Sequence, residues 1–160
     1  MKPNAIARQY RELAIKGATP VGLIVILYDM AIESLGHAKR EIDNGNIEAR
    51  TTDLNHVLLV IGELERSLNF EAGGEVAKRL AAFYDVARCK VLEANIKASK
   101  LVIDRLSDVL CSLRDAWKIV EQKTAGKSGA ELARETPRPS PVYSAPSPQD
   151  DDRPQLRWSA

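Results

Sequence analysis

Residues 103–120 read IDRLSDVLCSLRDAWKIV, and this stretch decides the fold class. A helix turns once in about 3.6 residues, so apolar residues at alternating steps of three and four lie along one of its sides. The stretch therefore predicts an amphipathic helix that begins after Ser99. Its apolar stripe consists of Ile103, Leu106, Leu110, Leu113, Trp117 and Val120.

Three earlier segments carry the same spacing. Pro20 suits the first position of the first helix, and the hydroxyl of Thr19 can cap its free amides. The second helix is expected from about Ile47, with Asn46 as its cap, and the third from around Gly74. The three stripes are Ile24, Tyr28, Ala31, Leu35, Ala38 and Ile42; then Leu54, Val57, Ile61, Leu64 and Leu68; then Val76, Leu80, Phe83, Ala87 and Val91.

Short links between long helices force neighbouring helices to run antiparallel. The predicted fold class is therefore all-α, an antiparallel up-down-up-down four-helix bundle over residues 20–124. Residues 1–19 precede it as an N-terminal cap segment. Residues 125–160 are expected to form a disordered, Pro-rich C-terminal tail, because six of the eight prolines fall there among Ser, Gln and Asp.

The composition excludes several classes of protein. Lys and Arg number 23 and Asp and Glu 22, and this net charge of +1 gives little drive for binding a nucleic-acid backbone. The longest aliphatic runs, residues 23–27 and 57–61, are far shorter than the roughly 20 residues of a membrane span. The first residues lack an apolar signal core, so a cytoplasmic protein is expected. Cys89 and Cys111 lack CxxC spacing and are interpreted as small core residues.

The residues that catalysis or metal binding would need are missing. A di-metal site in a helical bundle requires Glu-x-x-His on two helices, whereas His37 follows Ser34 and His56 follows Asp53 at that interval. Neither cysteine has the context of a nucleophile. We expect no enzyme activity, no cofactor and no metal site.

The second predicted helix has more apolar surface than one core stripe needs. Leu58, Leu59 and Val60 stand beside Val57 and Ile61 and make it apolar around much of its circumference. Such a helix is either deeply buried or exposes an apolar surface that can bind a partner, and the sequence leaves both interpretations open. The second reading suggests a bundle that holds the amphipathic helix of another protein.

Five local strings resemble the flagellar secretion chaperone FliS family in order and spacing, over about residues 5 to 122. They are Thr19-Pro20-Val21-Gly22-Leu23-Ile24 with Leu27-Tyr28-Asp29; Leu68-Asn69 with Glu71-Ala72-Gly73-Gly74-Glu75-Val76-Ala77; Phe83-Tyr84-Asp85; Leu92-Glu93-Ala94-Asn95; and Leu113-Arg114-Asp115-Ala116-Trp117-Lys118. Met30 departs from the family, in which many members have glycine after Leu-Tyr-Asp.

The resemblance implies a chaperone without catalysis. FliS-like proteins bind the disordered C-terminal segment of flagellin in the cytoplasm, prevent its premature polymerisation and deliver it to the flagellar type III export gate. In the family, the segment before the first helix closes over an apolar pocket, and the client displaces it. Two alternatives stay open: a helical adaptor that binds another flagellar or secretion component, and a metal-dependent enzyme.

The candidate partner-binding residues follow from this resemblance together with the apolar surface. Asn69, Asn95, Gly73, Gly74 and Trp117 are interpreted as architectural, with the Trp117 indole filling the end of the bundle. The candidates are Ile6, Tyr10 and Ile15 in the segment that closes the pocket, Tyr28 at the pocket edge, and Leu58, Ile61 and Leu68 on the second helix.

Overall fold

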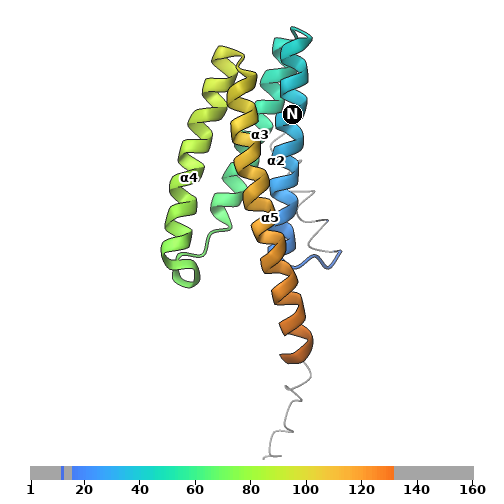
Figure 1. Cartoon of the computed structure of the whole chain (residues 1–160), viewed down its shortest axis with the longest axis vertical. Helices are drawn as coiled ribbons and strands as arrows, with labels where there is room; N and C mark the ends of the chain where they lie inside the picture. The colour runs from blue at the N-terminus through green and yellow to red at the C-terminus, as the bar shows by residue number, and fades with distance from the viewer. Residues whose placement is uncertain (1–11, 13–15, 132–160) are drawn as a thin grey trace, which may run out of the picture.

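A computed structural model describes residue 12 and residues 16–131 of the chain. Within them, four helices and no strand are present, which confirms the all-α fold class. Figure 1 shows the helices side by side. Ile6, Tyr10 and Ile15 lie outside the described residues, as does most of the predicted tail. The helices are α2 (Pro20–Asp43), α3 (Ile47–Arg66), α4 (Phe70–Lys97) and α5 (Lys100–Glu131).

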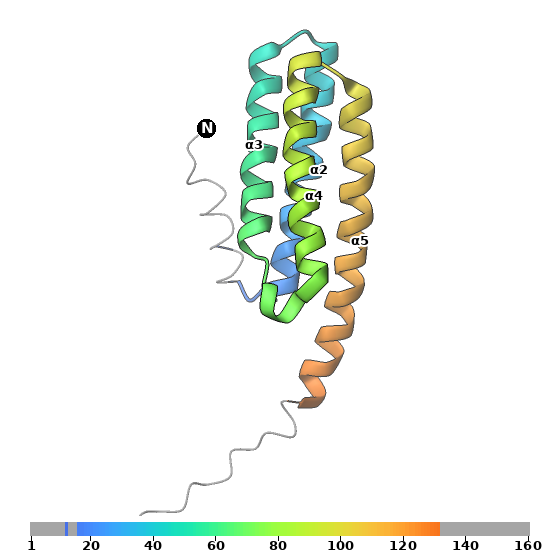
Figure 2. The same ribbon diagram turned by 90° about the vertical axis from the view of Figure 1, so that its left-hand side faces the viewer.

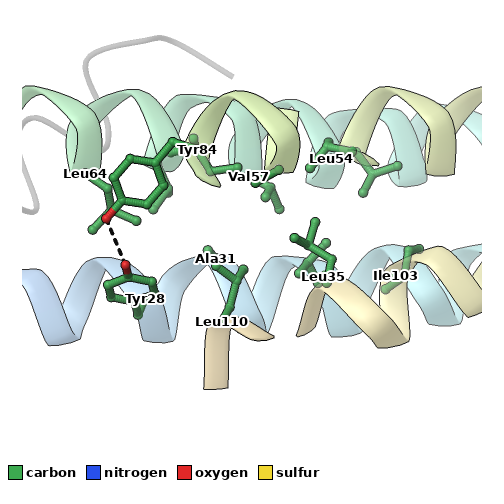
Figure 3. Close-up of a cluster of buried hydrophobic side chains, with 14 of the residues drawn as sticks. Tyr28, Ala31, Leu35, Leu54, Val57, Leu64, Tyr84, Ile103 and Leu110 are labelled. Atoms are coloured by element: carbon green, nitrogen blue, oxygen red, sulfur yellow. Dashed lines mark hydrogen bonds between the residues drawn. The ribbon is translucent and has the colours of Figure 1, made fainter. Parts of the chain in front are cut away.

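The helices form a ring in which each packs against its neighbours in the chain, and α5 closes the ring on α2. This arrangement confirms the up-down-up-down bundle (Figure 2). The centre of the ring holds most of the predicted stripes, and Figure 3 shows part of this core. The fully buried members include Tyr28, Ala31, Leu35, Ala38, Leu54, Val57, Ile61, Leu64, Ala87, Val91, Ile103 and Leu110.

Three predictions about burial are wrong. Val76 and Val120 belong to predicted stripes but are exposed, and Cys89 is exposed instead of buried, whereas Cys111 is half-buried. On α4, position 89 lies two residues from the buried Ala87 and two from Val91, which turns it about 200° away from both.

The predicted caps of α2 and α3 are confirmed. The backbone N–H of Gly22 donates to Thr19 Oγ1 at 2.9 Å, and that of Ala49 donates to Asn46 Oδ1 at 3.0 Å. The start of α4 differs from the prediction. It begins at Phe70, since Asn69 Oδ1 accepts from the amides of Glu71 and Ala72.

Helix α5 continues past Thr124, where the sequence places the end of the bundle, to Glu131. Its lower part extends beyond the link between α3 and α4 (Figure 2). Helix α5 contacts the start of α2 through a hydrogen bond in which Thr19 Oγ1 donates to Glu121 Oε1 at 3.2 Å.

In the described part of the chain, α2 is long and apolar enough, by length and composition alone, to cross a membrane. Half of the apolar window lies inside the bundle. Its buried residues contribute a large part of the core, and this burial fits a helix that packs one side into the core of a bundle.

Ala98 ends α4 in a left-handed conformation, with φ 48° and ψ 43°, which costs an L residue about 1–2 kcal/mol. Glycine avoids most of that cost, so Ala98→Gly should raise the free energy of unfolding by about 0.5–1 kcal/mol, measured by urea denaturation. Ala116→Gly, at an exposed position inside α5, is the control and should lower it by about 1 kcal/mol. Destabilisation by both substitutions would contradict the left-handed cap.

Candidate functional site

An apolar groove of about 500 Å³ opens at the end of the bundle where α3 turns into α4; we call it the end groove. Its volume lies within the range of protein ligand sites. Residues of all four helices and of the α3–α4 link line it: Pro20, Val21, Ile24, Leu64, Ser67, Leu68, Asn69, Ala72, Gly73, Val76, Ala77, Leu80, Tyr84 and Trp117.

The wall of the end groove on α4 depends on a break in the helix. Gly74 has φ 47° and ψ −124°, a conformation that only glycine adopts readily, so the turn from Phe70 to Gly73 leaves the axis of the rest of α4. Gly73 must also stay small, because a Cβ there would lie 2.9 Å from the Cβ of Ala77. Val76, the next apolar residue along the wall, remains 64% exposed.

Gly74→Ala should lower the free energy of unfolding by about 1–3 kcal/mol. The cause is backbone strain and not a clash, since nothing lies within 4 Å of the added Cβ. Gly36→Ala is the matched control, because it also meets open space but sits in regular helix, where alanine should gain about 0.5–1 kcal/mol. Chemical denaturation of both variants checks the prediction, and a gain for Gly74→Ala would contradict the kink.

Aromatic side chains from two helices reach the end groove. Tyr84 comes from α4 and Trp117 from α5, and Tyr28 of α2 lies beneath them. The Oη atoms of Tyr28 and Tyr84 are 2.8 Å apart, and the dashed line in Figure 3 marks this hydrogen bond. Burial raises the pKa of Tyr28, although the hydrogen bond with Tyr84 and the nearby Trp117 side chain act in the opposite direction. Burial and the neighbouring Tyr28 raise the pKa of Tyr84, so both phenols stay protonated.

The structure places the predicted site residues that it describes at different depths, and only one of them lines the end groove. Leu68 lines the end groove. Tyr28 and Ile61 are fully buried, so Tyr28 lies below the groove instead of at its edge. Leu58 is half-buried against the core and does not line the groove.

Sequence reasoning missed the remaining lining residues of the end groove. Val76 and Leu80 were assigned to the core stripe of the third helix, although they line the groove. Trp117, expected to fill the end of the bundle, is half-buried and faces this groove. The one available signal was the Asn69 to Gly74 break, which places polar and small residues between two apolar helices.

A second, smaller groove of about 240 Å³ runs between α4 and α5. We call it the side groove. It is lined by Phe83, Val86, Ala87, Lys90, Glu93, Val102, Arg105, Leu106 and Val109.

Other residues of the five strings tie the helices together. Arg114 Nη1 of α5 lies 3.1 Å from Asp29 Oδ1 of α2. Asn95 Oδ1 of α4 accepts hydrogen bonds from Arg50 and Thr51 of α3, each at 3.2 Å. These contacts support the architectural interpretation of Asn95.

No cluster of three or more His, Cys, Asp or Glu side chains suited to a metal ion occurs among residue 12 and residues 16–131. His56 Nδ1 instead lies 2.7 Å from Ser34 Oγ, between α3 and α2. Burial lowers the pKa of His56.

The family model described as "Flagellar protein FliS" matches residues 2–124. The chain belongs to the FliS family. FliS is a family of chaperones and not of enzymes, so membership supports a chaperone role in flagellar export. The residues that tie the bundle together and those that line the end groove fall within the matched range.

Curated FliS relatives from distant bacteria agree with this match. Flagellar secretion chaperone FliS of Salmonella typhimurium is 30% identical over 123 residues, which cover 76% of this chain and 91% of the relative. FliS of Vibrio cholerae is 27% identical over 118 residues, covering 74% and 87%. FliS of Bacillus subtilis is 28% identical over 109 residues, covering 68% and 80%.

Proposed function

We propose that this FliS-family chain is a cytoplasmic export chaperone that binds the disordered C-terminal segment of flagellin. It prevents premature polymerisation of flagellin and assists its delivery to the flagellar type III export apparatus. The observation that carries the proposal is the end groove, an apolar groove with a volume of about 500 Å³ in a chain of the FliS family.

The lining of the end groove suits an amphipathic helix. Leu68, Val76 and Leu80 offer aliphatic surface from two elements, and the exposed position of Val76 leaves it uncovered. Each large aliphatic side chain that the client buries contributes about 1.5–3 kcal/mol. Ordering a disordered client costs about 2–5 kcal/mol, so the complex can form and still release its cargo.

The N-terminal segment is followed directly by Pro20 and Val21, and both of these residues line the end groove. We propose that Ile6, Tyr10 and Ile15 cover the groove in the free protein and that the client displaces them. Leu68 contacts the client in the groove, whereas Tyr28, Leu58 and Ile61 support the bundle beneath and beside it.

Tyr10→Ala should therefore raise the affinity for the flagellin segment by about three- to tenfold, because the N-terminal residues that cover the groove in the free protein would then compete less with the client. Ala5→Gly, in the same segment, is the control and should leave the affinity within twofold. Isothermal titration calorimetry measures both. Unchanged or weaker binding by Tyr10→Ala would contradict a competing cover.

Calorimetric titration with the C-terminal segment of flagellin from the same organism tests the function itself. The full chain and a chain ending at Glu131, the end of α5, should both bind with one-to-one stoichiometry. No binding by either chain, with the helices shown folded by circular dichroism, would contradict the proposal and favour an adaptor for another secretion component. Binding lost only by the shorter chain would locate the working surface outside the bundle.

A further inference from the structure

One aromatic side chain of the end groove is hydrogen-bonded to a buried hydroxyl beneath it. Tyr28 is fully buried, and its Oη lies 2.8 Å from Tyr84 Oη. Trp117 lies close enough to the Tyr28 hydroxyl to act on its pKa. Tyr84 and Trp117 both line the end groove, whereas Tyr28 does not.

The three residues come from three helices, and the hydrogen bond between Tyr28 and Tyr84 crosses the bundle. Helix α2 packs mainly against α3 and α5, and α4 packs against the same two helices, so α2 and α4 occupy opposite corners of the ring. The Tyr28–Tyr84 hydrogen bond joins these corners through the core (Figure 3). It fixes the α4 wall of the groove relative to α2.

We propose that Tyr28 is a positioning residue of the end groove, whose hydroxyl holds the Tyr84 ring in the arrangement that receives the client beside Trp117. The inference rests on the proposed function for its effect on affinity. A phenol buried against apolar side chains loses free energy if its hydroxyl lacks a partner, so the Tyr84 ring keeps the orientation that reaches Tyr28. Without the Tyr28 hydroxyl, the Tyr84 ring can turn, and the groove surface that it shares with Trp117 loses its defined shape.

A purely stabilising hydrogen bond makes a different prediction, and another, partly buried pair allows the comparison. Ser34 Oγ and His56 Nδ1 lie 2.7 Å apart between α2 and α3, and neither residue lines the end groove. Ser34→Ala therefore removes a similar bond from the same helix without touching the groove. It is the matched control for Tyr28→Phe, which removes the hydroxyl and keeps the ring.

Calorimetry with the flagellin C-terminal segment gives the first readout. Tyr28→Phe should bind about five- to tenfold more weakly, the factor that one buried hydrogen bond is worth, while Ser34→Ala stays within twofold. The double variant Tyr28→Phe/Tyr84→Phe leaves neither phenol unpaired, so its stability should return toward that of the wild type. Its affinity should stay low. Affinity that follows stability across these variants would overturn the positioning role.

The second readout needs no client. In a Trp158→Phe chain, Trp117 is the sole tryptophan, because the sequence contains two. Tyr28→Phe should shift its emission to longer wavelength and increase acrylamide quenching, and Ser34→Ala should change neither. Unchanged Trp117 fluorescence in Tyr28→Phe would overturn the inference. If the wild type fails to bind flagellin but Trp117 still responds to Tyr28→Phe, the proposed function fails and the positioning role stands.

Discussion

The Val76→Asp variant is expected to fold like the wild type and to bind the flagellin C-terminal segment about 10- to 100-fold more weakly. Val76 is 64% exposed in the free protein, so a carboxylate there stays hydrated and costs the bundle little. In the complex, the same position would lie against an apolar client face in the end groove. The carboxylate would then have to lose water without gaining a partner.

Ile96→Asp is the control for Val76→Asp. Ile96 lies on the same helix, is 84% exposed and lines neither the end groove nor the side groove. It is also a β-branched aliphatic residue, so the chemical change is matched. Calorimetry should show wild-type affinity for Ile96→Asp. Equal losses in the two variants would mean that α4 binds the client along its whole exposed side or that charge alone weakens binding.

The Leu110→Ala variant is expected to lose about 2–5 kcal/mol of unfolding free energy. Leu110 is fully buried in the core between α5 and its neighbours, and Figure 3 shows it close to Ala31. Removal of three carbons from such a site leaves a cavity, because the surrounding side chains can relax only in part.

Val109→Ala tests whether the loss of stability depends on the burial of the truncated side chain. Val109 is the preceding residue in the chain and is 44% exposed, so its truncation should cost less than about 1 kcal/mol. Urea denaturation of both variants gives the comparison. A loss at Val109 as large as that at Leu110 would contradict the orientation of α5 in the bundle.

The fold could be predicted from the sequence because its core stripes follow the helical period without interruption. Leu110 and Ile103 are buried where the spacing puts them. The prediction is wrong at Val120, because helical spacing identifies one side of α5 but not where along its length a neighbouring helix stops covering that side. The last turns of α5, to Glu131, lack an apolar stripe, yet a formed helix gains one hydrogen bond for each residue added.

The end groove could be predicted only in part. Leu68 is a candidate from the FliS resemblance together with the apolar surface of the second helix, and it does line the groove. Val76 was assigned to the core because helical spacing cannot show that Gly74, two residues earlier, adopts a positive φ and displaces the first turn of α4. Tyr28 was placed at the edge, although its hydroxyl is buried under Tyr84. The depth of a side chain depends on helices far apart in the sequence.

The central claim is that the end groove receives the flagellin segment, and site-specific photocrosslinking tests it most directly. A benzophenone amino acid placed at Val76 should crosslink to the C-terminal segment, and an excess of unlabelled segment should compete the product away. The same amino acid at Ile96, outside both grooves, should give little product. Crosslinking from Ile96 but not from Val76, with binding confirmed by calorimetry, would place the client elsewhere on the bundle and contradict the account.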